Sequence, residues 1–161
     1  MRPVTVIGLT VVIASALAVH TLGQADSARK APTGDEIVQT CGSRIAKMFS
    51  RFGLPENLTA ERGSKPEFDK VIVIYGPFGF STRDKTVRAC LFYSGYTGVV
   101  RGVHIGDTRA QVEQALGREH KVEKSSIDVD DYGYALKDLD AVFWTDFDKD
   151  GKVRLIEVQL N

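Results

Sequence analysis

The stretch Gly102-Val-His-Ile-Gly-Asp-Thr-Arg-Ala-Gln-Val-Glu-Gln-Ala-Leu-Gly117 decides the fold class that we expect for this chain. Its first part is typical of a strand end followed by a tight glycine turn. Thr108 predicts a helix N-cap, and Gln111 lies where its side chain can complete a capping box. Val112 begins an apolar face, and Gly117 can take the positive φ that often ends a helix. The stretch therefore specifies a backbone path and carries no catalytic chemistry.

A second capping box, Thr33-Gly-Asp-Glu36, begins an amphipathic segment nearer the N-terminus. Apolar side chains recur there every three to four residues, at Ile37, Cys41, Ile45, Met48 and Phe52. This spacing predicts one core-facing helix that ends at Gly53, before Pro55. The polar face of the segment is not rich in lysine and arginine, which argues against a membrane-surface helix.

Runs of β-branched and aromatic residues predict strands at 71–75, 86–93, 141–147 and 153–160. Residues 57–68 are expected to form a polar loop, and residues 76–80 a turn region. The halves 33–98 and 99–161 each contain a helix, a terminal glycine, a charged loop and two strands. We therefore expect a single α+β domain over 33–161, with two helices packed on one face of an antiparallel sheet. The repeated order also raises the hypothesis of two degenerate helix-plus-hairpin repeats.

The first 25 residues are typical of a secretory signal peptide. Arg2 precedes an apolar run at 4–19, and Gly23 and Ala25 place small residues at −3 and −1 before Asp26. We expect cleavage after Ala25, a flexible lead-in at 26–32, and a periplasmic or secreted protein. The alternative is an uncleaved anchor, which would be the protein's only contact with a membrane. The formal net charge of zero provides no basic field for nucleic acid.

Export would expose Cys41 and Cys90 to an oxidising compartment. An even count with no third partner favours one disulfide between them. The alternative is two buried free thiols, because the sequence does not show whether the two Cβ atoms meet.

The acidic segment Asp146-Phe-Asp148-Lys-Asp150-Gly151, with Glu157 further on, has the spacing of an EF-hand calcium loop. Its flanks are strand-like, whereas an EF-hand needs helices. We therefore favour a β-hairpin in which the glycine takes a turn position. Calcium binding by Asp146, Asp148 and Asp150 is kept as the alternative function, and no other cofactor is expected.

Nucleophilic catalysis finds no support, because neither His104 nor His120 lies in a motif with serine or cysteine. We therefore expect a protein that is not an enzyme; an unrecognised hydrolase using either histidine is the weakest alternative. The acidic run Asp128, Asp130 and Asp131 is interpreted as a solvated face. Aromatic residues near chain breaks are the candidate binding surface. They are Phe78, Phe80, Tyr96, Tyr132 and Tyr134.

The segment Gly102-Val-His-Ile-Gly-Asp-Thr108, followed by Val112, Leu116 and Gly117, resembles the motif of small outer-membrane assembly lipoproteins of the SmpA/OmlA (BamE-like) type. The resemblance covers residues 102–161. The same α/β unit occurs twice in β-lactamase inhibitory protein, which the two halves also resemble. It implies a non-catalytic inhibitor or envelope assembly factor that binds an unknown protein partner through sheet and loop surfaces. The chain departs from the family in having no lipobox cysteine and no proline after Gly117.

Overall fold

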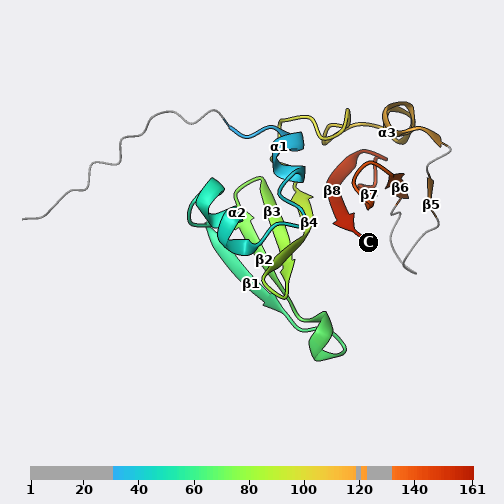
Figure 1. Ribbon diagram of the computed structural model, residues 1–161. Helices are drawn as coiled ribbons and strands as arrows, with labels where there is room; N and C mark the ends of the chain where they lie inside the picture. The colour runs from blue at the N-terminus through green and yellow to red at the C-terminus, as the bar shows by residue number, and fades with distance from the viewer. Residues whose placement is uncertain (1–30, 119–120, 123–131) are drawn as a thin grey trace, which may run out of the picture. The chain divides into compact units, whose positions relative to one another are not determined.

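The computed structural model describes residues 31–118, 121–122 and 132–161 (Figure 1). The expected signal peptide, most of the lead-in, His120 and the acidic run at 128–131 lie outside the described residues. Residues Ala31–Asn161 form one unit. Within the described part of this unit, no helix is both long enough and apolar enough to span a membrane.

An antiparallel sheet dominates the structure. Its strands are β1 (Asn57–Glu61), β2 (Lys70–Tyr75), β3 (Phe78–Arg83), β4 (Thr86–Phe92), β5 (Lys121–Val122), β6 (Tyr132–Leu136), β7 (Ala141–Phe147) and β8 (Val153–Leu160). They are arranged in the order β1-β2-β3-β4-β8-β7-β6-β5. The two halves of the chain meet where β4 pairs with β8, with Cys90 opposite Val158. Strands β1 and β5 lie at the two edges of the sheet.

The α-helices of the described residues are α1 (Gly34–Val38), α2 (Ile45–Phe52) and α3 (Arg109–Leu116). Both predicted capping boxes are confirmed. The Thr33 hydroxyl accepts from the Glu36 N–H, and the Glu36 side chain accepts from the Thr33 N–H. Thr108 and Gln111 exchange the same two hydrogen bonds. Gly117 ends α3 with φ of 85°, as its position predicts. Local hydrogen bonding therefore determines where these two helices begin and where α3 ends.

The prediction of one continuous helix from Thr33 to Phe52 is wrong. The chain leaves the helix after α1, and Gly42 takes φ of 80°. The Gly42 N–H donates to the Val87 carbonyl at 2.8 Å, and the Val87 N–H donates to the Ser43 carbonyl at 2.9 Å. Strand β8 pairs with β4 only from Ala89 onward, so the start of β4 has free backbone groups. The backbone of Gly42 and Ser43 pairs with these groups instead of continuing the helix that the amphipathic pattern predicts.

The prediction of a turn over 76–80 is also wrong. Only Gly76 and Pro77 form the turn, and Phe78 begins strand β3. Gly76 has φ of 64°, as the first central residue of a type II′ hairpin turn requires. The strand contains glycine, serine and threonine, so it lacks the hydrophobic alternation that would have marked it.

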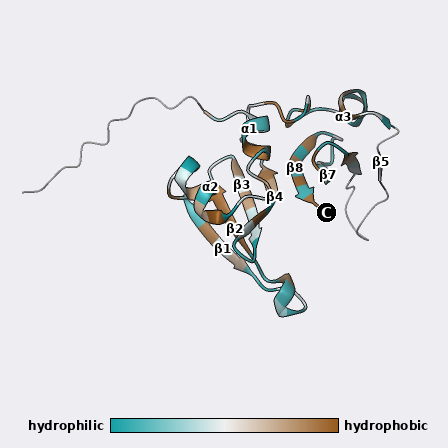
Figure 2. Cartoon of the chain, viewed as in Figure 1, coloured by the Kyte–Doolittle hydropathy of each residue, from teal (hydrophilic) through white to brown (hydrophobic). Residues whose placement is uncertain are grey.

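The expected fold, two helices packed on one face of an antiparallel sheet, is wrong in its proportions and arrangement. Each half contributes four strands instead of a single hairpin. The helices among the described residues are short: three α-helices and one 3₁₀ helix, Pro66–Phe68. The core is built mostly from strand side chains, with Ile37, Met48 and Val112 as fully buried helix residues. Figure 2 shows hydrophobic residues, in brown, on both helical and strand segments. The helix-plus-hairpin repeat is therefore also incorrect, because each half has strands that hydrophobic periodicity does not reveal.

Candidate protein-binding site

The aromatic residues predicted to form a binding surface lie in the interior. Phe78, Phe80, Tyr96 and Tyr134 are exposed by 8% or less. Phe52 of α2 has its ring centroid 5.6 Å from that of Phe78 and 5.2 Å from that of Phe80. These four rings are packed in the core, so the prediction that they form a contact surface is wrong. Phe78 and Phe80 are buried against Phe52 and Tyr75, and Tyr96 is packed against Phe92.

The fifth ring, Tyr132, is half-buried. The Arg109 guanidinium lies over it, with Cζ 3.9 Å from the ring centroid. Phe147 packs against the same ring in a T-shaped arrangement, with the centroids 5.8 Å apart. Tyr132 therefore joins α3 to the β6–β7 part of the sheet, and this cation–π contact supports the fold.

The predicted acidic segment forms the hairpin between β7 and β8, as favoured from the sequence. The Asp148 carboxylate accepts from the N–H groups of Asp150 and Lys152, both at 2.9 Å. The Asp146 carboxylate pairs with Arg154, whose Nη2 lies 2.6 Å from Oδ2. Among the described residues no group of three or more His, Cys, Asp or Glu side chains is arranged to hold a metal. Calcium binding stays a prediction, and calorimetric titration with calcium tests it.

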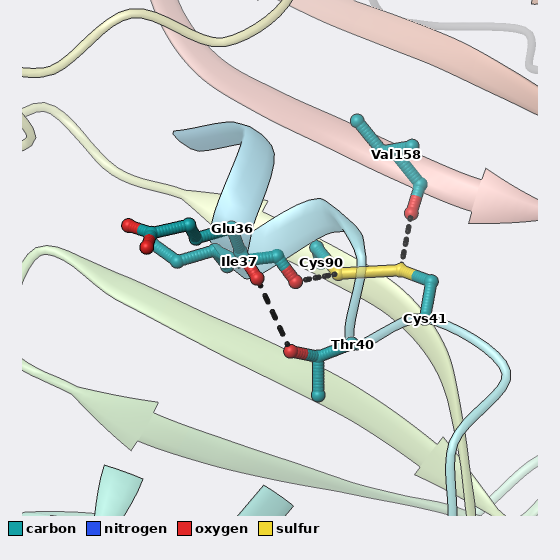
Figure 3. Close-up of a disulfide and its surroundings, with 6 residues drawn as sticks. All are labelled: Glu36, Ile37, Thr40, Cys41, Cys90 and Val158. Atoms are coloured by element: carbon teal, nitrogen blue, oxygen red, sulfur yellow. Dashed lines mark hydrogen bonds between the residues drawn. A yellow bond between two sulfur atoms is a disulfide. The ribbon is translucent and has the colours of Figure 1, made fainter. Parts of the chain in front are cut away.

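The predicted disulfide is present: Cys41 is bonded to Cys90, and their Cα atoms are 6.5 Å apart (Figure 3). Cys41 lies in the α1–α2 connection and Cys90 is fully buried on β4. The Cys41 Sγ lies 3.7 Å from the Val158 carbonyl oxygen of β8. The bridge therefore fastens the N-terminal segment to the middle of the sheet.

Exposed large apolar side chains gather near one edge of the sheet. Of the five in the described chain, four belong to residues 54–71, and the fifth is Val99. The four are Leu54, Leu58, Phe68 and Val71, exposed by 92%, 55%, 45% and 36%. Leu58 lies on β1, Val71 lies on β2 opposite Ala60, and Leu54 and Phe68 lie in the segments before and after β1.

Strand β1 forms this edge of the sheet. It pairs with β2 on one side only, and all five of its residues are exposed. Its sequence has no proline and no lysine, the residues that commonly block an open edge. The opposite edge strand, β5, is only two residues long. Among the described strands, β1 is therefore the longer edge and the more accessible one for a further strand.

A groove of about 410 Å³ lies beside β1. Ala60, Val71 and Thr82 occupy one register row across β1, β2 and β3 and contribute to its lining. Ile45 and the β3–β4 turn at Asp84 add to the wall. The groove thus combines an apolar row with charged residues at the strand ends. The sequence had suggested only a polar loop here, because the two apolar residues of β1, Leu58 and Ala60, are too few to reveal a strand.

His104 is the one histidine of the hydrolase hypothesis that the structure describes. His104 is exposed, and its Nδ1 lies 3.5 Å from the Asp107 carboxylate. That carboxylate also accepts from the His104 backbone N–H at 2.7 Å, within the turn before α3. The acid thus has a clear local role in shaping this turn, and the hydrolase hypothesis stays untested.

No family model matches the chain, and no curated protein matches it. The fold is similar to that of an extracellular protein containing an SCP domain from Bacillus anthracis, with a TM-score of 0.53, 10% identity, and 83% of this chain and 48% of that one covered. It is also similar to a cysteine-rich secretory protein from Staphylococcus aureus, with a TM-score of 0.50, 15% identity, and coverage of 76% and 45%. At these identities the likeness is one of fold. The chain spans less than half the length of either protein.

The predicted resemblance to SmpA/OmlA (BamE-like) lipoproteins is wrong, and so is the kinship to β-lactamase inhibitory protein that was drawn from it. The fold is similar instead to the two structures named above. A DUF4309 family protein from Bacillus subtilis matches with a TM-score of 0.47, 20% identity, and coverage of 74% and 79%. The glycines of the motif explain the misleading match. Gly102, Gly106 and Gly117 take φ of 85°, 92° and 85°. They form two turns and a helix end, which chains of different families can share.

Proposed function

We propose that the protein is an exported, non-catalytic module that binds an extended segment of a partner protein along the free edge of β1. The observation that carries the proposal is the coincidence of this unpaired edge with most of the exposed large apolar side chains. An added strand would gain main-chain hydrogen bonds from β1, while alternate side chains would contact Leu58 and the groove.

Three observations support export. The sequence predicts a signal peptide over residues 1–25, and disulfides such as Cys41–Cys90 persist in oxidising compartments. The two similar structures named above are described as an extracellular protein and a secretory protein. The non-catalytic role rests on the sequence, in which no nucleophile and base share a recognised motif.

The hydrogen bonds of β1 identify the residue to change. The Leu58 N–H donates to the Asn57 side chain at 2.8 Å. Because alternate amides of an edge strand point away from the sheet, the N–H of Ala60 also belongs to the outward set. The substitution Ala60→Pro removes an outward donor and leaves the pairing with β2 in place. Ala60→Val is the matched control, because it changes the side chain and keeps the N–H.

The test is a selection of random dodecapeptides displayed on phage against the exported, disulfide-bonded protein. We expect selected peptides to protect the Leu58 and Ala60 amides from hydrogen exchange. We expect them to bind A60V more tightly than folded A60P, and to bind folded A60P at least about tenfold more weakly than the wild type, a factor of the size that one lost hydrogen bond produces. Failure to enrich any peptide, or equal binding to folded A60P, would overturn the proposal.

A further inference from the structure

The groove beside β1 has more cationic than anionic side chains. Its charged residues are Arg62, Lys70, Arg83, Lys85, Glu61, Asp69 and Asp84. Two of the three carboxylates already have partners nearby. The Glu61 carboxylate lies 3.0 Å from the Lys70 ammonium, and the Asp69 carboxylate accepts from the Gly63 N–H at 3.0 Å. With four cationic and three anionic side chains, the lining carries a net charge of +1, which favours an anionic ligand.

Arg83 is the cation best placed to recognise an anion. Its guanidinium lies over the Phe68 ring, with Cζ 5.5 Å from the centroid. Its Nε is buried and has no hydrogen-bond acceptor among the described residues. A buried N–H without an acceptor is unfavourable, and a carboxylate is the acceptor that fits a guanidinium on two nitrogens at once. The Phe68 ring also restricts the guanidinium, so less side-chain freedom is lost when a ligand binds.

The groove also limits the form of the ligand. Its lining includes Ala60, so a segment paired with β1 passes directly beside it. Arg83 follows Thr82 on β3 and also lines the groove, so the groove extends from the edge strand to this guanidinium. A free anion would use the charge but would gain nothing from Ala60 and Val71, the apolar part of the lining.

We propose that the groove accepts an acidic side chain of the bound segment and that Arg83 binds its carboxylate. This inference rests on the proposed function, because the acid belongs to the segment paired with β1. It commits the partner to an extended peptide with a glutamate or aspartate at one register position. Charge complementarity between this acid and the groove is the basis of the choice.

The test uses synthetic octapeptides of alternating threonine and valine, each with one glutamate, which is moved through every position. A second set carries glutamine in place of glutamate. Titration into ¹⁵N-labelled protein gives Kd and shows which amides respond. We expect one glutamate position to bind about tenfold more tightly than its glutamine twin, as a charge-assisted pair predicts. R83Q should bring the glutamate peptide to the affinity of the glutamine peptide.

K85Q is the matched control, because it removes one positive charge from the same groove and leaves the Arg83 fork intact. It should keep most of the preference for glutamate. If the wild type binds both peptide sets equally along β1, the inference about Arg83 fails but the proposed function stands. The same holds if K85Q loses the preference for glutamate as completely as R83Q does. If no peptide of either set shifts the β1 amides, or if folded A60P binds both sets as the wild type does, the proposed function itself fails.

Discussion

The N–H of Gly42 donates a hydrogen bond of 2.8 Å to the carbonyl oxygen of Val87. This bond lies next to the disulfide, because Cys41 precedes Gly42 and its partner Cys90 follows Val87 by three residues on the same strand. A covalent bond and backbone pairing therefore hold the α1–α2 connection on β4. The position of α2, and with it the Ile45 wall of the groove, depends on this attachment.

Removing the disulfide should lower stability substantially. The bond closes a loop with a sequence separation of 49 residues. The chain-entropy model assigns about 4 kcal/mol to a loop of this length, and measured losses are commonly somewhat smaller. We expect C41A/C90A to lose about 3 kcal/mol in its free energy of unfolding, measured by urea denaturation. Identical urea midpoints for the wild type with and without reductant would contradict this prediction.

The β3–β4 turn should be improved by glycine. Its central residues Asp84 and Lys85 have φ of 50° and 61°, as a type I′ turn requires, and neither is glycine. Lys85→Gly should raise the free energy of unfolding by about 0.5–1 kcal/mol, because glycine takes this conformation without strain. The bond from the Ile45 N–H to the Lys85 carbonyl at 2.9 Å uses backbone atoms and is retained. K85A, which keeps the strain, should show no gain in thermal unfolding; an equal gain in both variants rules out this explanation.

Gly79 on β3 should not tolerate a side chain. A Cβ at this position would lie 2.7 Å from the Val73 carbonyl oxygen and 3.4 Å from the Tyr93 hydroxyl. Because the first of these atoms is backbone on the paired strand, Gly79→Ala should cost about 2 kcal/mol by overpacking. Gly95→Ala is the control, since the nearest atom to its Cβ would be the Pro77 Cβ at 3.5 Å. Chemical denaturation that finds equal losses for both variants would refute the proposed clash.

Stability should fall at alkaline pH. Burial raises the pKa of the Tyr75, Tyr93, Tyr96 and Tyr134 hydroxyls above the usual 10.0, and nearby Glu157 and Glu61 add to the effect at Tyr93. Above about pH 10 the unfolded chain has lost these protons while the folded chain retains them. The stabilisation is thus complete below pH 10 and is lost as pH rises through the folded-state pKa values.

This prediction is checked by urea unfolding at several pH values between 7 and 11, with phenolate absorbance followed in parallel. Y93F should show a shallower decline than the wild type, because one of the four raised groups is gone. A free energy of unfolding that stays constant to pH 11 would show that these pKa shifts are absent.

Features that depend on neighbouring residues were predictable. Each capping box joins residues three positions apart, and Gly117 needs only a positive φ, so short-range geometry specifies them. The turn between β7 and β8 is equally local, with Asp148 accepting from N–H groups two and four residues on. The pairing of Cys41 with Cys90 followed from their being the chain's two cysteines, together with the predicted export.

Other features could not be read from any local window. The helix expected through Gly42 is broken because β4 provides free backbone groups that the segment pairs with. Phe78 and Phe80 are buried because Phe52 of α2 packs against both rings, although β1 and β2 lie between them in the sequence. The open edge of β1 and the Arg83 Nε that has no acceptor exist only once strands β1, β2 and β3 are in register. By itself the sequence determined the caps, the β7–β8 turn and the cysteine pair, because those bonds span a few residues or follow from composition. Tertiary structure alone decided the strand order, the burial of the aromatic rings and the candidate binding edge, because these depend on partners far apart in the chain.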